Sequence, residues 1–259
     1  MAEQTDKLIV NALDRALDIM IYMYEQGHPV RISDMARDLG QYKSTIYRAL
    51  YTMEQRGFVE KDPMNDTYWL GMKLFAIGSR VQEKMSITNL VQPYAKALYD
   101  ELHEVVNLSV LELHGVDRPK IIVVHKEESD SQLLKANPAI GKFSDCHSSA
   151  AGKCLLAYSD EFDIDTVEPF SLCKYTEHTI TKWDAFVQMI HQVREDGYAV
   201  DLEEREYGLT CIGAPILDRR GHAVAALSIA GPSNRMDQNL DEKIQRVKYM
   251  ADLVSQKYI

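Results

Sequence analysis

The chain has 259 residues, a length that predicts two domains at about 150 residues each. Its 46% hydrophobic and 26% charged residues are typical of a core-forming protein and exclude a largely disordered one. The net charge of −10 opposes binding to nucleic acid on average. That charge is uneven, however, because residues 1–84 hold 11 basic and 12 acidic side chains and the other residues carry the remaining −9. A local basic surface is therefore compatible with this acidic chain.

Membrane and secreted classes are disfavoured by the same sequence. The longest apolar runs, such as Ile121–Val124, fall far short of the roughly 18 residues that a membrane helix needs. The N-terminal stretch MAEQTDKLIV lacks the apolar core of a targeting segment. No CxxC spacing relates the cysteines, which favours reduced thiols over a disulfide framework; they are Cys146, Cys154, Cys173 and Cys211. We expect a cytoplasmic protein without a membrane partner.

The first 40 residues predict one long and one short helix. Apolar residues recur at three- and four-residue spacing from Leu13 to Tyr24, and Gly27-His28-Pro29 ends that helix. After a short extended link, Ser33 is expected to cap a second helix that runs to Leu39. Gly40 then ends this helix.

A third helix and a hairpin follow. The helix runs from Lys43 to about Arg56, and its apolar face is formed by Ile46, Ala49, Leu50 and Met53. Residues 58–61 and 67–70 read as two strands on either side of a turn at 62–66. Three helices and a hairpin in this order are typical of a winged helix-turn-helix.

The remaining residues predict an α+β fold. An amphipathic helix from Gly71 to just before Ser86 is expected to link the two domains, which gives boundaries of 1–71, 72–86 and 87–259. The helix after it spans about 89–103. Further helices are expected at 148–158, 160–168, 181–197 and 238–257, the third with a weak capping box at Thr181 and Asp184. Strands at 107–113, 120–125, 210–217 and 222–230 pair as hairpins, which indicates a mainly antiparallel sheet.

The helix at 43–56 carries residue types that bind DNA. Its first turn combines Lys and hydroxyl side chains with the free N–H groups and positive dipole end that favour phosphate. An arginine one turn later can bind guanine edges. The candidate DNA contacts are Lys43, Ser44, Thr45, Tyr47, Arg48 and Arg56. A solvated amphipathic helix without a partner has the same charge pattern, but the preceding short helix and the following hairpin favour DNA.

Motifs along nearly the whole chain resemble the IclR family of bacterial transcriptional regulators. In the N-terminal part they are residues 11–19, 32–40, 43–50 and 68–71. In the C-terminal part they are HSSAAGK at 147–153, DLEEREYGLTCIGAP at 201–215 and ALSIAGP at 226–232. The resemblance implies a winged helix-turn-helix joined to a GAF-like effector domain, in which a small organic ligand lies beside the sheet.

The resemblance also implies which residues line the effector pocket. Carried over position by position, they are Ser144, Ala150, Ala151, Asp201, Leu209, Cys211, Ser228 and Ala230. Ser228 and Ala230 share a strand face, and small residues there leave room for a ligand. The Ala150-Ala151-Gly152 stretch lets helix N–H groups approach an anion. The family often has a serine where this chain has Ala230, so we expect an effector larger or less polar than a two- or three-carbon oxoacid.

Other functions are compatible with some of these residues. Cys211 with His147 as its base would predict a thiol hydrolase or acyltransferase, but an inert core cysteine is the favoured interpretation of Cys211, since free cysteine is commonly a small core residue. Cys146, His147 and Cys154 form a possible metal site, but adjacent ligands fit a tetrahedral ion poorly. The winged helix could bind protein instead of DNA. Asp201 either binds ligand or anchors backbone N–H groups.

The expected function is a regulator without enzymatic activity, cofactor or metal. We expect a homodimer or homotetramer that places two 43–56 helices in successive major grooves of double-stranded operator DNA. The turn around Asn65 would touch the DNA backbone. A small organic acid in the C-terminal domain would change the separation of the two helices through the 72–86 helix. Repression of catabolic genes is the favoured outcome.

Overall fold

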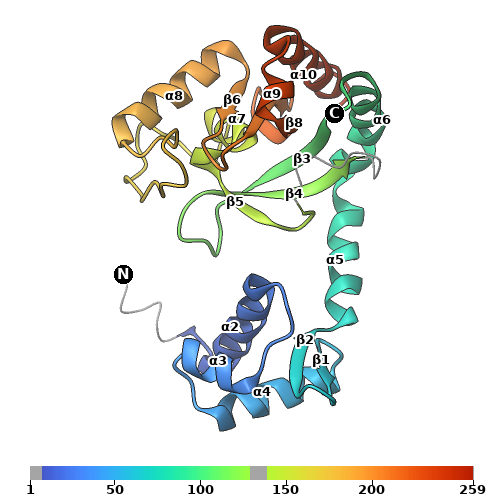
Figure 1. Cartoon of the computed structure of the whole chain (residues 1–259), viewed down its shortest axis with the longest axis vertical. Helices are drawn as coiled ribbons and strands as arrows, with labels where there is room; N and C mark the ends of the chain where they lie inside the picture. Colours follow the sequence, from blue (N-terminus) through green and yellow to red (C-terminus); the bar gives the residue numbers. More distant parts are fainter. Residues whose placement is uncertain (1–7, 129–138, 259) are drawn as a thin grey trace. The chain divides into compact units, whose positions relative to one another are not determined.

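The computed structural model describes residues 8–128 and 139–258. The chain divides into two compact units between Lys84 and Met85 (Figure 1). Within the described ranges, no helix combines the length and apolarity needed to cross a membrane. The expectation that the N-terminus lacks a targeting segment falls mostly on residues 1–7, which lie outside the described residues.

The N-terminal unit has three helices and a hairpin in the predicted order. The elements are α2 (Asn11–Gln26), α3 (Ile32–Asp38), α4 (Lys43–Gln55), β1 (Val59–Asp62) and β2 (Thr67–Leu70). Gly27 (φ 68°) and Gly57 (φ 76°) adopt the left-handed conformation after α2 and α4, which glycine does at little steric cost. The predicted cap at Ser33 is wrong. Arg31 is the N-cap of α3 and makes no side-chain cap bond, so Ser33 lies inside the first turn.

A small core joins these elements. Ile19 and Met23 of α2 pack with Ile46 and Leu50 of α4, and all four side chains are fully buried. Val30 exchanges two backbone hydrogen bonds with Tyr68 of β2, which attaches the hairpin to the helices. The core therefore fixes α4 against both α2 and the hairpin.

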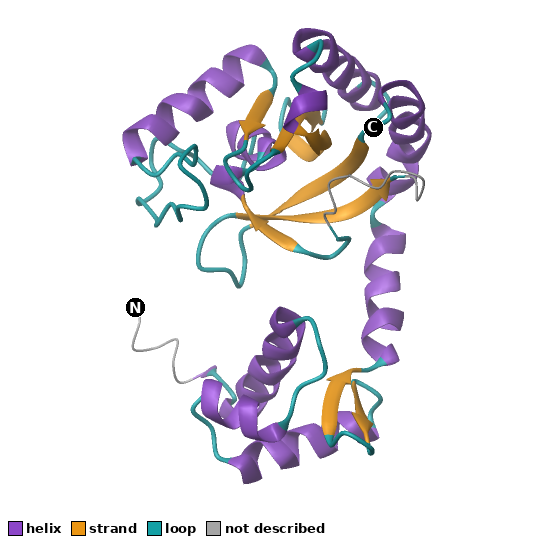
Figure 2. Cartoon of the chain, in the orientation of Figure 1, coloured by secondary structure: helices purple, strands orange, loops and turns teal. Residues whose placement is uncertain are grey.

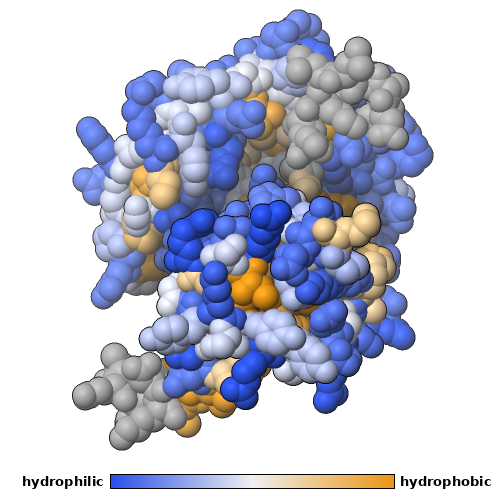
Figure 3. Space-filling view, turned by 60° about the horizontal axis from the view of Figure 1, so that its bottom comes forward, coloured by the Kyte–Doolittle hydropathy of each residue, from blue (hydrophilic) through white to orange (hydrophobic). Residues whose placement is uncertain are grey.

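Two apolar stripes in this unit lie outside the core. Along α2, Leu13, Leu17, Ile21 and Tyr24 are 40–58% exposed. The following helix, α5 (Met72–Lys84), contains no buried residue at all; its exposed apolar side chains are Met72, Phe75, Ile77 and Val81. Apolar side chains accordingly interrupt the hydrophilic surface of the molecule (Figure 3). The sequence periodicity predicted both helices correctly, but many of the apolar residues that produce this periodicity are exposed on the surface.

The C-terminal unit is built on one six-stranded antiparallel sheet. Its strand order is β5-β4-β3-β8-β7-β6. In chain order the strands are β3 (Val105–Glu112), β4 (Lys120–Glu127), β5 (Phe143–Asp145), β6 (Ala199–Leu202), β7 (Leu209–Leu217) and β8 (Ala223–Pro232). The predicted α+β class with a mainly antiparallel sheet is confirmed.

Different helices cover the two faces of this sheet (Figure 2). On one face, α6 (Ser86–Leu102) and α10 (Leu240–Ser255) pack against the buried side chains of Leu108, Ile212 and Leu227. On the other face lie α7 (Ala150–Ala157) and, packed on it, α8 (Trp183–Asp196). Because side chains alternate along a strand, β8 directs Leu227 and Ile229 to the first face and Ser228 and Ala230 to the second. The second face therefore carries the small residues.

Some local predictions in this unit are wrong. Residues 160–168 form turns instead of a helix, because Ser159 and Asp163 accept hydrogen bonds from backbone N–H groups two or three residues ahead. Thr181 does not cap α8, whose N-cap is Lys182. The sequence analysis also missed β5, β6 and α9 (Ser233–Met236), which have only three or four residues each. Such short segments show no periodicity.

Two glycines allow α7 to lie very close to its neighbours. A Cβ added to Gly152 would come within 2.4 Å of the Cα atom of Cys146. A Cβ added to Gly213 of β7 would lie 2.9 Å from the backbone of Ala150. Ser149 caps α7 by accepting the Gly152 N–H. The start of α7 is thereby fixed close to the sheet.

We expect Gly152→Ala to destabilise the protein by about 1–3 kcal/mol, because the added methyl group would collide with backbone that cannot rotate away. Gly78→Ala in α5 is the matched control. Nothing lies within 4 Å of a Cβ at Gly78, so alanine there should stabilise the helix by up to about 1 kcal/mol. Urea unfolding measures both, and an equally stable Gly152→Ala variant would contradict the close packing of α7.

Candidate functional site

The helix α4 presents most of the predicted DNA contacts to solvent. Five of them are exposed and Thr45 is half-buried; the five are Lys43, Ser44, Tyr47, Arg48 and Arg56. The opposite face of the helix is anchored in the core by Ile46, Leu50 and Met53. The candidate DNA contacts of α4 thus face solvent, while its apolar residues face the core. A helix that enters a DNA groove requires this separation.

The start of α4 also offers free backbone donors. Its N-cap, Tyr42, makes no side-chain cap bond, and the Tyr42 carbonyl accepts the N–H groups of Thr45 and Ile46 at 2.9 and 3.1 Å. The N–H groups of Lys43 and Ser44 precede the first helical hydrogen bonds and have no acceptor within the helix. A helix start of this kind favours an anion such as phosphate.

The cations of α4 and of its C-cap, Arg56, are unpaired, as are Arg15, Arg31 and Lys73 among the described residues. Among the described residues, Lys43, Arg48 and Arg56 form no ion pair, whereas Arg37 of α3 pairs with Asp38 at 2.7 Å. Lys61 of β1 pairs with Asp66 at 2.8 Å. Unpaired cations can bind phosphates without first breaking an internal contact, and they release condensed counterions from DNA when they do so.

The turn between β1 and β2 is less suited to DNA than expected. The Asn65 amide donates to Asp62 at 2.6 Å, and the Met64 N–H donates to the same carboxylate at 2.9 Å. These bonds lower the pKa of Asp62 and keep it negative. The hydrogen bond to Asp66 raises the pKa of Lys61. The Asn65 amide and the Lys61 ammonium group, the two groups of this hairpin that could bind a phosphate, are therefore already bound to Asp62 and Asp66. DNA contact by this turn stays a prediction.

A cavity of about 800 Å³ opens on the second face of the sheet. Strands β3, β4, β7 and β8 form its floor, the start of α7 forms one wall, and residues 203–208 form another. Seven of the eight predicted pocket residues line it: Ser144, Ala151, Asp201, Leu209, Cys211, Ser228 and Ala230. Ala150 does not line the cavity, because it is fully buried against Gly213 of β7.

Two further residues of the cavity were missed by the sequence analysis. Asn107 lies on β3 directly opposite Ser228 of β8, and its side-chain oxygen is buried without a hydrogen-bond partner. The Ser148 hydroxyl, also on the cavity wall, is likewise buried and unpartnered. A buried polar atom without a partner is costly, and a bound ligand is one way to satisfy it. An asparagine in the largely apolar strand β3 was the available sequence indication.

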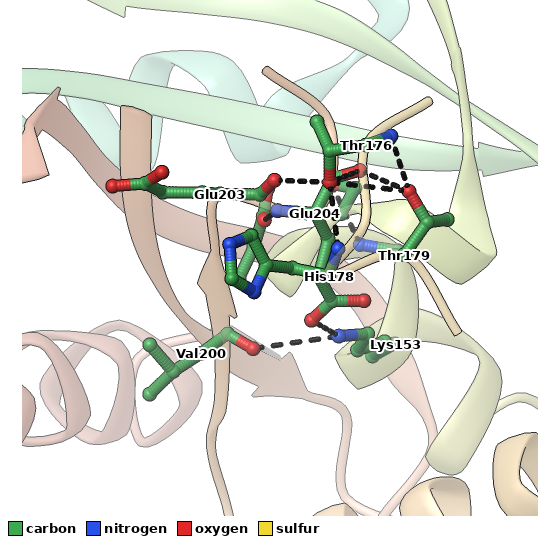
Figure 4. Close-up of polar contacts among 10 residues, drawn as sticks. Lys153, Thr176, His178, Thr179, Val200, Glu203 and Glu204 are labelled. Atoms are coloured by element: carbon green, nitrogen blue, oxygen red, sulfur yellow. Dashed lines mark hydrogen bonds and ion pairs between the residues drawn. The ribbon is translucent and has the colours of Figure 1, made fainter. Parts of the chain in front are cut away.

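A buried charge cluster supports the wall at residues 203–208 (Figure 4). Lys153 of α7 is fully buried, and its Nζ atom forms an ion pair with Glu204 and a 3.4 Å hydrogen bond to the Val200 carbonyl. Burial raises the pKa of Glu204, and Lys153 opposes that rise. Thr179 Oγ1 donates to the Glu204 carbonyl at 2.6 Å. The loop at residues 203–208 is therefore attached to α7 through Lys153 and to the segment before α8 through Thr179.

Asp201 lies next to this cluster on the cavity wall. Its carboxylate is 2% exposed and accepts the Glu204 N–H at 2.7 Å. Burial, together with repulsion by Glu204, raises the pKa of Asp201 to about 7, although Lys153 partly opposes this rise. Asp201 thus accepts a hydrogen bond from the backbone and also lines the cavity. Its predicted roles as a backbone anchor and as a ligand contact are therefore both compatible with the structure.

Three of the cysteines, Cys146, Cys154 and Cys211, have raised pKa values and so lack the character of activated thiols. Burial raises the pKa of Cys211 well above its ordinary value, which is the opposite of what a nucleophilic thiolate requires. His147 Nε2 donates to the Cys173 carbonyl at 2.9 Å, and burial lowers the pKa of His147. Burial also raises the pKa of Cys154 to about 12. Within the described residues, no group of three His, Cys, Asp or Glu side chains is placed to hold a metal ion.

Comparisons with known proteins identify relatives over nearly the whole chain. A family model described as the bacterial transcriptional regulator IclR C-terminal domain matches residues 79–256, and the IclR helix-turn-helix domain model matches residues 12–63. The HTH-type transcriptional regulator KdgR of Escherichia coli is 32% identical, over 88% of this chain and 84% of that protein. The transcriptional repressor IclR of the same organism is 31% identical, over 88% and 82%.

A solved structure shares the fold. The IclR homologue of Microbacterium hydrocarbonoxydans, in complex with 4-hydroxybenzoate, has a TM-score of 0.78 and 21% identity, with 95% of this chain and 98% of that chain covered. The proteins that these comparisons name are regulators, so the hydrolase alternative gains no support from them.

The raised pKa of Asp201 predicts a pH dependence of stability. The unfolded chain releases the Asp201 proton near the ordinary value of 3.8 and the folded chain near 7. The free energy of unfolding should therefore fall as the pH rises between these values and level off above the higher one. Asp201→Asn, which keeps an acceptor for the Glu204 N–H, should remove this contribution. Unfolding of both proteins at intervals from about pH 4 to pH 8 tests this, and parallel pH profiles would contradict it.

Proposed function

This chain belongs to the IclR family of bacterial transcriptional regulators, and on that premise we propose that it represses a catabolic operon until a small organic acid binds to it. One observation carries the proposal: a helix with unpaired cations and a separate open cavity lined in part by polar side chains occur in one chain. The repressor IclR among its relatives favours repression over activation. Residues 1–71 would bind DNA, 72–86 would form the linker, and 87–259 would bind the effector.

We assign operator binding to α4. Its first turn, with Lys43, Ser44 and Thr45, would hold phosphate, and Tyr47 and Arg48 would reach base edges in the major groove. Arg56 would contact phosphate at the other end of the helix. Binding through such contacts weakens steeply with salt, because each phosphate that is neutralised releases counterions. The acidic C-terminal unit would stay clear of the duplex.

The cavity is assigned to the effector. Its volume of about 800 Å³ lies in the usual range for small-molecule sites and fits a ligand larger than a two- or three-carbon oxoacid. Six serines line it, so the ligand need not be apolar. We add Asn107 and Ser148 to the seven predicted lining residues, because their unpartnered atoms would be satisfied by polar groups of the ligand. 4-Hydroxybenzoate, bound by the Microbacterium homologue, shows that a member of this fold accepts an organic acid.

A homodimer is proposed from the exposed apolar stripes of α2 and α5. A single winged helix-turn-helix buries too little surface to specify an operator, so a second copy of this DNA-binding unit is needed. Leu13, Leu17 and Ile21 form a stripe at four-residue spacing, the pattern by which two helices pack. A second copy of this chain would cover the stripe and thereby pair two DNA-binding heads.

We expect Arg48→Ala to weaken binding to operator DNA by about 5- to 150-fold, since a base contact is worth about 1–3 kcal/mol. The protein should remain folded, because the side chain is exposed and unpaired. Fluorescence anisotropy with the chain's own upstream DNA measures this. Arg219→Ala, which removes an exposed arginine from the other unit, is the control and should bind normally. Equal affinity of both variants would remove Arg48 from the contacts.

A double substitution tests the dimer. Leu17→Glu with Ile21→Glu places two charges on the α2 stripe and should shift the protein toward monomer in light scattering after gel filtration, because charges are not tolerated in an apolar interface. DNA affinity should fall together with the oligomeric state. Met64→Glu alters a side chain that is 90% exposed in the β1–β2 turn and should leave the mass unchanged. A dimer that persists in the double variant would place the interface elsewhere.

A further inference from the structure

Arg205 is a cavity-lining cation without an ionic partner. The described residues form no ion pair with it, and its Nη1 atom is buried without a hydrogen-bond partner. A guanidinium group has only donors, so the missing partner must be an acceptor. On the basis of the proposed function, we propose that Arg205 binds the carboxylate of the effector and makes the cavity selective for monocarboxylic acids.

The Arg205 side chain is held in position before any ligand arrives. Its guanidinium carbon lies 3.8 Å from the ring centroid of Tyr175. The Tyr175 hydroxyl donates to Asp145, which also forms a 3.1 Å ion pair with Arg118. The neighbouring residue Glu204 is fixed by its ion pair with Lys153. A pre-positioned guanidinium loses little side-chain entropy when it binds an anion.

The acidic groups around Arg205 are already engaged. Asp145 is bound by Arg118 and Tyr175, and Glu204 by Lys153. Glu203 accepts hydrogen bonds from the Gly208 N–H and the Ser233 hydroxyl, which lower its pKa. Asp201 accepts the backbone N–H groups of Glu204 and Arg205. The Tyr175 hydroxyl accepts a hydrogen bond from Arg205, but neither this hydroxyl nor Glu206 partners the Nη1 atom of Arg205. A bound molecule would supply that acceptor.

The charge balance of the cavity favours a carboxylate over a phosphate. Its lining contains two cations, Lys142 and Arg205, against Glu203, Glu206 and the partly ionised Asp201, whose pKa is about 7. A dianionic phosphate would be repelled by this lining more strongly than a single carboxylate. A carboxylate also matches the two parallel donors of a guanidinium group.

The experiment is a thermal-shift and calorimetry screen of the full chain. The probes are two- to ten-carbon monocarboxylic acids, with acetate, lactate and 4-hydroxybenzoate among them, each tested beside its neutral primary amide. Inorganic phosphate is tested in parallel. At least one acid should bind more tightly than its amide by about 10- to 100-fold, the range expected for a charge-assisted hydrogen bond. Arg205→Gln should lower the affinity for that acid by a similar factor and abolish the preference over the amide.

Arg219→Gln is the matched control, because it removes an arginine that does not line the cavity, and it should bind the acid like the wild type. The inference is overturned if no acid binds, if acid and amide bind equally, if Arg205→Gln keeps the preference, or if only phosphate binds. Binding of the same protein preparations to DNA distinguishes failure of the proposed function from failure of the role assigned to Arg205. Loss of DNA binding by the wild type would overturn the proposed function, whereas intact DNA binding with any overturning ligand result would overturn only the role of Arg205.

Discussion

The buried ion pair between Lys153 and Glu204 is the contact on which the cavity depends. Lys153 belongs to α7, whose first residues form one wall, and Glu204 belongs to the loop that forms the opposite wall. An ion pair in such an enclosed place holds only while both partners are present, because an isolated buried charge costs about 3–5 kcal/mol. The pair therefore links two walls of the cavity and helps to fix the position of Arg205, the residue that follows Glu204.

Charge is distributed over the chain in accordance with its function. Residues 1–84 are almost neutral overall. Asp34, Asp38 and Asp66 pair with Arg37 and Lys61, whereas the cations on α4 remain available to DNA. In the C-terminal unit, Lys153 pairs with Glu204 and Arg118 with Asp145, whereas Arg205 has no ionic partner among the described residues. Each unit thus has an unpaired cationic group, and each of these groups faces the position proposed for its anionic partner.

The sequence was sufficient where the structure is determined locally. Long amphipathic helices such as α2, α4 and α10 and the hairpin of β7 and β8 follow from periodicity and turn residues. The short strands β5 and β6 exist because long neighbours pair with them, and no local pattern indicates that. Periodicity also cannot separate a core stripe from a surface stripe, as Leu13 and Phe75 show. Motifs located most of the cavity, but Asn107 and Arg205 depend on missing partners that only the three-dimensional structure reveals.

The central claim is that the cavity and the DNA-binding helix are energetically coupled. It is tested most directly by measuring the affinity of the full chain for its own upstream DNA, with and without a saturating concentration of the acid that stabilises the protein most. The account predicts that the acid weakens DNA binding by about 5- to 150-fold, the usual range of coupling between two sites. An acid that stabilises the protein but leaves the DNA affinity unchanged would contradict it.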